Sequence, residues 1–159
     1  MSEVSGAIRV IGIGNRDRGD DALGPLVVDA LRDRLAATVS AVEHSGEVAG
    51  LLDLISGAGA VYLVDAAVMG LEPGSFREFD ASTSPLPALG GAFSSHALGL
   101  SEAIELARAL DALPSVCRVF AVEATSFEAG EGLSQPVAFK LPRVTQAVID
   151  RIRRESGYA

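Results

Sequence analysis

The chain has 159 residues, with 21 Asp and Glu against 13 Lys and Arg, and its formal net charge is −8. This length fits one domain, because about 150 residues bury roughly 70% of the surface that the unfolded chain exposes. With 48% hydrophobic and 21% charged residues, the composition excludes a disordered chain. The excess negative charge argues against nucleic acid or an anionic membrane surface as a partner, since both would repel it.

Cysteine content and apolar run lengths bear on the compartment. Cys117 is the single cysteine and cannot form an internal disulfide, which favours a reducing cytoplasm. Residues 1–6 do not begin a signal peptide, and no window approaches the roughly 20 apolar residues that cross a bilayer. We therefore expect a cytoplasmic protein without a membrane partner. The lack of a heptad pattern favours a monomer.

Hydrophobic periodicity predicts strands and helices in alternation. Pro25 fits the first turn of the first helix, where its missing N–H costs nothing. In chain order, the sequence predicts a strand at 7–14, a helix at 22–35, a strand at 38–43, a helix at 47–56, a strand at 60–65, an antiparallel strand at 75–79, a helix at 97–110, a strand at 116–122, and a last helix that starts near 134–136 and restarts at 142.

This order predicts an α/β fold with three layers. The strands are rich in β-branched residues and nearly continuous in hydrophobicity, which is typical of strands buried on both faces. We expect a twisted, mostly parallel sheet of about five strands with helices on both faces, and one domain over residues 1–159. The long loop at residues 80–95 is at the upper end of normal length, which favours a functional loop.

Several polar residues follow the predicted strands, where open α/β sheets bind their ligands. The first strand leads to Asp20 and Asp21, the third ends on Asp65, the fifth ends near Glu123, and His96 starts a later helix. Two carboxylates and an imidazole form a set that suits Ni²⁺, Zn²⁺ or Fe²⁺ better than Ca²⁺. Their convergence on one sheet edge predicts a divalent-cation site with open positions.

Each of these residues also has a purely structural interpretation. An acid at a helix start stabilises the helix by about 0.3–1 kcal/mol, which would explain Asp20 or Asp21 as a cap. Asp65 could be a surface turn residue, although the run around it is apolar. His96 could donate to a loop carbonyl at its helix start. Taken singly, each of these interpretations is at least as good as the functional one.

Other chemistries find less support. Gly12 and Gly14 suggest a dinucleotide turn, but Asp17 stands where a third glycine belongs, and the carboxylates of this turn would repel a pyrophosphate. The P-loop spacing and the Gly-x-Ser-x-Gly elbow are both absent from the sequence. Cys117 falls in mid-strand and is best explained as inert core.

Several segments together resemble the hydrogenase maturation endopeptidases, and the resemblance extends through most of the chain. The most specific feature is Gly-Asn followed shortly by Asp-Asp and Gly-Pro, which is not a general α/β pattern. The segments are Ile11–Asn15, Gly19–Pro25, Leu63–Ala66 and Ser94–Leu100.

The resemblance implies an endopeptidase that removes the C-terminal extension of a nickel-loaded large-subunit precursor of nickel–iron hydrogenase. It implies that Asp21, Asp65 and His96 form the metal site and carry catalysis, with Asp20 as a further candidate. The nickel would be supplied by the precursor, and no organic cofactor is expected. Residues 44–47 depart from the glycine- and threonine-containing turn of the family, and we interpret His44 as a polar loop residue.

The mechanism and two other function classes stay open. The shared metal could activate a water or the scissile carbonyl as a Lewis acid, or Asp20 or Asp21 could act as a general base. A non-enzymatic metal-binding or metal-delivery module would use the same three residues. A nucleotide-binding α/β protein is the second alternative.

Overall fold

The computed structural model describes residues 6–87 and 95–156. In this part of the chain five strands form one sheet in the order β2-β1-β3-β5-β4, and β4 alone runs antiparallel to its neighbour. The elements are β1 (Ala7–Ile13), the short 3-10 helix η1 (Gly19–Ala22), α1 (Leu23–Leu31), β2 (Val39–His44), α2 (Val48–Ser56), β3 (Ala58–Ala67), β4 (Phe76–Asp80), α3 (Ser95–Ala109), β5 (Val116–Glu123) and α4 (Gln135–Ser156).

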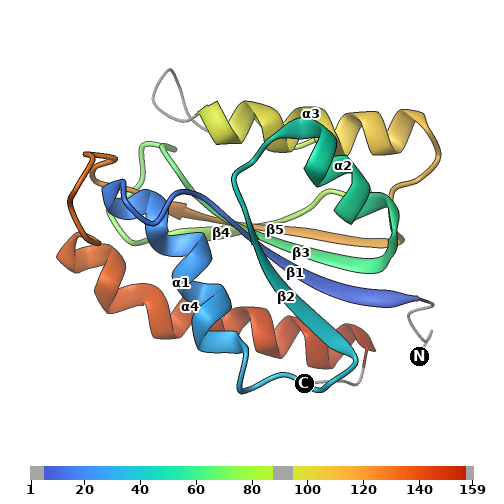
Figure 1. The fold of residues 1–159 in the computed structure, drawn as a ribbon, viewed down its shortest axis with the longest axis horizontal. Helices are drawn as coiled ribbons and strands as arrows, with labels where there is room; N and C mark the ends of the chain where they lie inside the picture. Colours follow the sequence, from blue (N-terminus) through green and yellow to red (C-terminus); the bar gives the residue numbers. More distant parts are fainter. Residues whose placement is uncertain (1–5, 88–94, 157–159) are drawn as a thin grey trace.

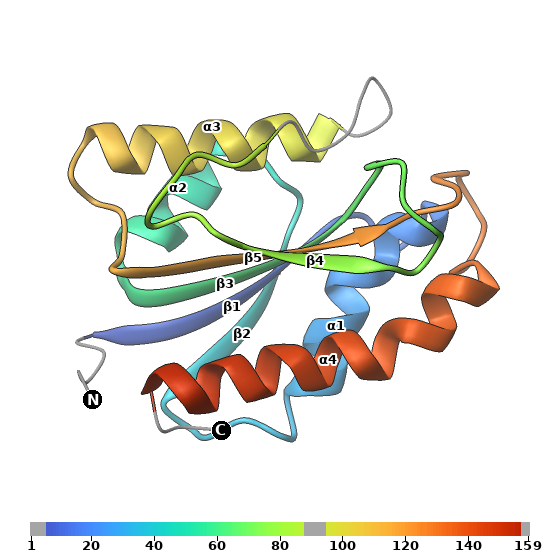
Figure 2. The ribbon, with the colours of Figure 1, turned by 180° about the vertical axis from the view of Figure 1, so that it is seen from behind.

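The helices lie on both faces of the sheet, as Figures 1 and 2 show, with α1 and α4 on one face and α2 and α3 on the other. Successive strand residues point to opposite faces, so each strand contributes to both cores. In β3, Tyr62 and Val64 belong to the core under α1 and α4, while Leu63 belongs to the core under α2 and α3. The predicted three-layer α/β fold is therefore confirmed.

The first helix ends earlier than the sequence predicts. α1 stops at Leu31, whereas the apolar spacing extends to residue 35. Residues 32–34 are all exposed, and the Arg34 N–H bonds to Leu31 O at 2.9 Å, a three-residue step that closes the helix. Leu35 still packs against the core, but it does so from the connection to β2.

The last helix is continuous, and the predicted restart at residue 142 is wrong. α4 includes Pro142 within its span. Proline removes one helical hydrogen bond, to the carbonyl four residues earlier. Pro142 and Ala138 are both exposed, so water can solvate the carbonyl that loses its partner, and the helix continues through the proline.

The start of α1 is pressed against the carboxyl ends of the strands. A Cβ on Gly24 would collide with the backbone of Ile13 and Val64, and one on Gly12 would collide with Gly24 itself. Because Gly12 and Gly24 have no side chains, the backbones of β1 and α1 can lie in close contact. This contact places η1, which immediately precedes α1, at the end of β1. The fold thereby brings the two adjacent acids of η1 to the edge of the sheet where functional residues are expected.

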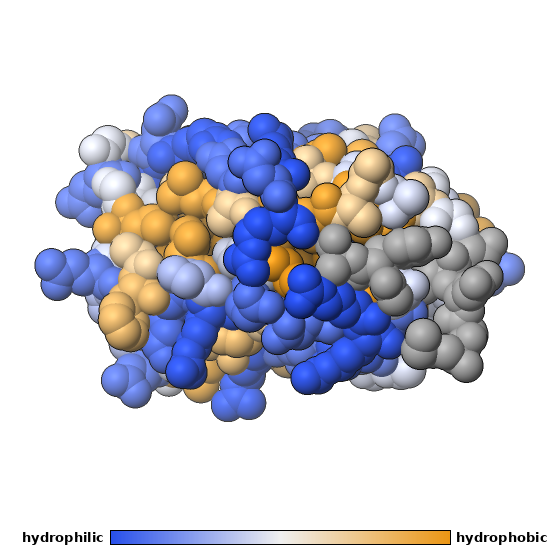
Figure 3. Space-filling model, turned by 90° about the horizontal axis from the view of Figure 1, so that it is seen from below, coloured by the Kyte–Doolittle hydropathy of each residue, from blue (hydrophilic) through white to orange (hydrophobic). Residues whose placement is uncertain are grey.

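The face covered by α1 and α4 mixes hydrophilic surface with separate hydrophobic patches (Figure 3). Phe139 in α4 is 82% exposed, which is the largest exposed fraction among the described large hydrophobic residues. Within the described ranges, no helix has both the length and the apolar character needed to cross a membrane. Residues 88–94 of the predicted functional loop lie outside the part of the chain that the structure describes.

Candidate active site

Asp21 lies in the turn between β1 and α1 (residues 14–22, the β1–α1 turn). Its side chain is 1% exposed, and its Oδ2 accepts a hydrogen bond from Asn15 N at 3.0 Å. Gly14 has a φ of 146°, and a Cβ there would collide with Asp21 O, so the turn folds back closely on itself. The Asp21 carboxylate is thus held beside the carboxyl end of β1.

Asp65 lies inside β3 and not at its end, because β3 continues to Ala67. It pairs in register with Ala121 of β5 and is 2% exposed. Leu63 and Ala67, two residues before and after it, both belong to the core under α2 and α3. Strand alternation therefore points Asp65 to that same face. The interpretation of Asp65 as a surface turn residue is wrong.

His96 lies in the first turn of α3, while its side chain falls outside the described part of the chain. A Cβ on Gly99 would collide with Gly46 O, so α3 lies directly on the connection from β2 to α2 just after its first turn. α3 covers the face to which Asp65 points (Figure 1). The backbone thus brings three elements to one edge, and among the described residues no group of three potential ligands forms a metal cluster.

Asp20 is fully buried and bonded to a distant part of the chain. Its two carboxylate oxygens accept four hydrogen bonds, from Thr125 N at 2.7 Å, Ser126 N at 3.2 Å, Ser134 N at 2.7 Å and Ser134 Oγ at 2.9 Å. The caps of η1 and α1 carry no side-chain hydrogen bond. Asp20 and Asp21 are therefore not hydrogen-bonding caps, although both lie in the first turn of η1.

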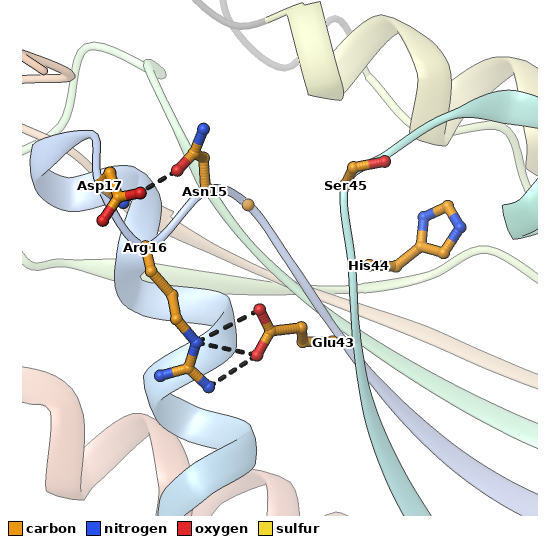
Figure 4. Close-up of a pocket in the computed structure, with 7 residues that line it drawn as sticks. Asn15, Arg16, Asp17, Glu43, His44 and Ser45 are labelled. Atoms are coloured by element: carbon orange, nitrogen blue, oxygen red, sulfur yellow. Dashed lines mark hydrogen bonds and ion pairs between the residues drawn. The ribbon is translucent and has the colours of Figure 1, made fainter.

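A pocket of about 390 Å³ lies where β1 and β2 end, lined by residues 14–17 and 43–45 (Figure 4). On its wall, Arg16 donates to Asp29 at 2.7 Å and to Glu43 at 2.6 Å. Hydrogen bonds to Asp29, which has the larger effect, and to Glu43 hold the pKa of the Arg16 guanidinium above its ordinary value. In turn, the hydrogen bond from Arg16 lowers the pKa of the Asp29 carboxyl group. This cluster was missed by the sequence analysis, since its members are far apart in the chain.

His44 is the last residue of β2 and is half-buried. Its ring points away from Arg16 in Figure 4, and its Nδ1 accepts a hydrogen bond from Gly46 N at 3.0 Å. An accepting Nδ1 places the proton of the neutral ring on Nε2. His44 thereby orders the connection between β2 and α2, against which the N-terminal part of α3 packs.

Glu123, at the end of β5, has a role that the sequence did not indicate. It is 5% exposed, and its Oε1 accepts from Met69 N at 2.7 Å and Leu71 N at 3.2 Å. These bonds fix the segment that follows Asp65 in the chain. Its position at a strand end marked Glu123 as a candidate, but its partners are separated from it by more than fifty residues.

Comparisons with known proteins agree with this arrangement. A family model described as hydrogenase maturation protease (HycI) matches residues 27–151, a range that includes Asp65 and His96 but begins after Asp21. A sequence comparison with curated proteins found no match.

Solved structures of this kind share the fold along nearly their whole length. The hydrogenase maturating endopeptidase HybD from E. coli has a TM-score of 0.81 at 23% identity, with 93% of each chain covered. The hydrogenase maturation protease HycI from Thermococcus kodakarensis has a TM-score of 0.70 at 26% identity, with 92% of each chain covered. Because the family model spans most of the chain and the fold agrees, this chain is a peptidase that belongs to the hydrogenase maturation protease family.

Proposed function

We propose that this peptidase removes the C-terminal extension of a nickel-loaded large-subunit precursor of nickel–iron hydrogenase. In this proposal the nickel arrives as part of the substrate, and Asp21, Asp65 and His96 recognise it. The observation that carries the proposal is the position of two nearly fully buried carboxylates at the sheet edge where α3 begins. Burial removes water from a carboxylate, and charged groups in such surroundings are typical of a site that binds a cation.

The donor set fits nickel. Two carboxylates and one imidazole are borderline ligands that suit Ni²⁺, whereas Ca²⁺ takes more ligands, all of them oxygen. Three ligands from the peptidase leave the remaining positions of the metal to the precursor, so that recognition requires nickel to be already inserted. Cleavage would then report that metal insertion is complete.

Two mechanisms remain as proposals. The nickel could polarise the scissile carbonyl or a water, which is Lewis-acid catalysis. Alternatively, a site carboxylate could accept the proton of the attacking water. Between the two adjacent acids, Asp21 is the better base, because the oxygens of Asp20 already accept four hydrogen bonds.

The pocket between β1 and β2 is the proposed path for the precursor's tail. It lies at the β1–α1 turn, which also carries Asp21, and the charged side chains that line it are those of Arg16, Asp17 and Glu43. Arg16 already donates to Asp29 and Glu43, so the exposed carboxylate of Asp17 is the group that can accept hydrogen bonds from a peptide there. We further propose that the protein is a cytoplasmic monomer, with no organic cofactor and no nucleic acid or membrane partner.

The decisive experiment measures the mass of a nickel-loaded precursor before and after incubation with the protein. We expect the wild type to shorten the precursor, and Asp21→Asn, Asp65→Asn and His96→Gln to leave its mass unchanged. Asp33→Asn, an exposed acid beyond α1, is the matched control and should cleave normally. Full activity in Asp21→Asn overturns both the ligand and the base assignment for Asp21.

Two measurements separate the other function classes, the precursor mass for the first and thermal unfolding for the second. A metal-delivery module would bind nickel tightly and leave the precursor mass unchanged. A nucleotide-binding protein would gain about 2.7 kcal/mol of stability from a dinucleotide at one hundred times its Kd. We expect no such gain from thermal unfolding with added dinucleotide.

A further inference from the structure

The buried carboxylate of Asp20 joins two segments that are far apart in the sequence. Thr125, Ser126 and Ser134, which donate to it, lie in the segment between β5 and α4 (residues 124–134, the β5–α4 segment). Figures 1 and 2 show this segment, in orange, beside the blue turn that precedes α1. Asp20 is therefore a cross-link between the β1–α1 turn and the β5–α4 segment.

Backbone hydrogen bonds join the same two segments on either side of Asp20. Asp20 N donates to Ser126 O at 2.8 Å, Gly19 N to Glu131 O at 2.9 Å, and Gly130 N to Asp17 O at 2.7 Å. Arg18 and Ala129 form an isolated antiparallel bridge between them. Of these contacts, only those of the Asp20 side chain are charge-assisted, and all four are made by one fully buried carboxylate.

The cross-link extends to Asp65 through a short chain of contacts. Thr125 N bonds to Asp20 Oδ2, and the preceding residue, Ala124, donates its N–H to Ala67 O at 2.9 Å. Ala67 is two residues beyond Asp65 on β3. On the other side, Asp20 is the direct neighbour of Asp21 in η1. Two hydrogen bonds thus separate the backbone around Asp21 from the backbone around Asp65.

We propose that Asp20 is a positioning residue for the cleavage reaction, which fixes where Asp21 lies relative to Asp65. This inference rests on the proposed function, in which both carboxylates contact the nickel of the substrate. Asp20 does not touch the reacting atoms, and it acts by holding the β1–α1 turn against the β5–α4 segment. Without it, η1 is attached to the β5–α4 segment by backbone contacts alone. The start of α1 still packs on Ile13 and Val64, so the loss falls on the exact placement of the Asp21 carboxylate relative to Asp65.

The first test compares turnover of the nickel-loaded precursor by three variants. Asp20→Asn replaces one accepting oxygen by a donor, and a misplaced catalytic group can cost about 100-fold, so we expect kcat to fall by about that factor while KM changes little. Ser134→Ala keeps three of the four hydrogen bonds and should lose about tenfold or less. Glu131→Gln, an exposed acid of the same segment, should retain wild-type kcat.

The second test restores the cross-link without Asp20. Directly opposite residues of an antiparallel pair have Cα atoms about 4.5–5.5 Å apart, which is within the range of a disulfide. Arg18→Cys with Ala129→Cys, in the Asp20→Asn background and in the wild type, replaces the side-chain tie by a covalent one. We expect oxidation to restore most of the lost kcat and prior reduction, followed by removal of the reductant, to abolish the gain. Native Cys117 is buried and should not respond.

The outcomes distinguish positioning from direct chemistry. A kcat of Asp20→Asn within threefold of wild type overturns the proposal, and so does a low kcat that the oxidised disulfide does not restore. Amide hydrogen exchange in the free protein needs no substrate, and we expect faster exchange at Thr125, Ser126 and Ser134 in Asp20→Asn. Unchanged exchange overturns the cross-link, whereas a wild type that leaves the precursor uncut overturns the proposed function alone.

Discussion

Gly99 offers a direct test of the claim that the packing of α3 places His96 at the site. In the structure a Cβ at residue 99 would collide with Gly46 O, which is backbone and cannot rotate away. Gly99→Ala therefore forces the N-terminal part of α3 away from the connection between β2 and α2. His96 precedes Gly99 by less than one helical turn and must move with it.

The expected effect on stability is small, because two terms oppose each other. Inserting a methyl group into a closed contact costs about 1–3 kcal/mol. Replacing glycine by alanine within a helix returns about 0.5–1 kcal/mol. The net loss is therefore about 0–2.5 kcal/mol, which a folded protein tolerates at room temperature. The effect on turnover is larger, since displacing a catalytic group by about 1 Å can cost 100-fold.

The assay is kcat for the nickel-loaded precursor, combined with urea unfolding of the same preparations. Gly132→Ala is the matched control, because a Cβ at that position meets nothing within 4 Å. We expect Gly99→Ala to lose far more activity than stability and Gly132→Ala to lose neither. A folded Gly99→Ala with kcat within threefold of wild type would refute the claim that this contact positions His96.

Three further predictions concern stability, each measured by urea unfolding. Burial raises the pKa of the Cys117 thiol from 9.0 to about 12. Between these pH values the folded protein keeps the thiol proton and the unfolded chain loses it. The free energy of unfolding is therefore highest below pH 9 in this respect and declines as the pH rises toward 12. Cys117→Ala should flatten this decline by up to about 1.4 kcal/mol per pH unit, and equal slopes would contradict the assignment. Glu155→Ala removes the acceptor of Tyr62 Oη at 3.1 Å and the nearest carboxylate of Arg118, also at 3.1 Å, and we expect a loss of about 1–3 kcal/mol, with a smaller loss in Glu155→Gln. Pro142→Ala restores a helical hydrogen bond in α4 and should stabilise the protein by about 1–3 kcal/mol, and an unchanged midpoint would show that the proline is already accommodated.

The fold could be predicted from the sequence because its signals are local. Strand runs and helical spacing lie within segments of ten or so residues, and they indicate both the α/β class and the antiparallel β4. Two predictions were wrong, the end of α1 and the restart at Pro142, because solvent exposure in the folded protein decided both. Pro142 is tolerated because Ala138, whose carbonyl loses its partner, is an exposed residue. α1 ends early because residues 32–34 offer no apolar side chain to bury.

The candidate site could be predicted only in part. Ligands of open α/β sheets bind at the carboxyl ends of the strands, and this rule needs only the order of strands and helices along the chain. It places Asp21 and Asp65 at the same edge of the sheet. The partners of Asp20 could not be predicted, because Thr125 and Ser134 are 105 and 114 residues away from it. The assignments of Asp21, Asp65 and His96 as ligands stay predictions, and the family model begins at residue 27, so it does not bear on Asp21.

The adjacent acids of η1 show why composition alone says little about this site. Asp20 and Asp21 contribute equally to the net charge of −8, yet their carboxylates have different partners. Asp21 accepts from Asn15 within its own turn, whereas Asp20 accepts from the β5–α4 segment. A single charge at this edge could bind a cation or hold the turn, but hydrogen bonds that occupy both oxygens prevent one carboxylate from doing both. Under the proposed function Asp21 binds the cation while Asp20 holds the turn, so neither of the two consecutive acids is redundant.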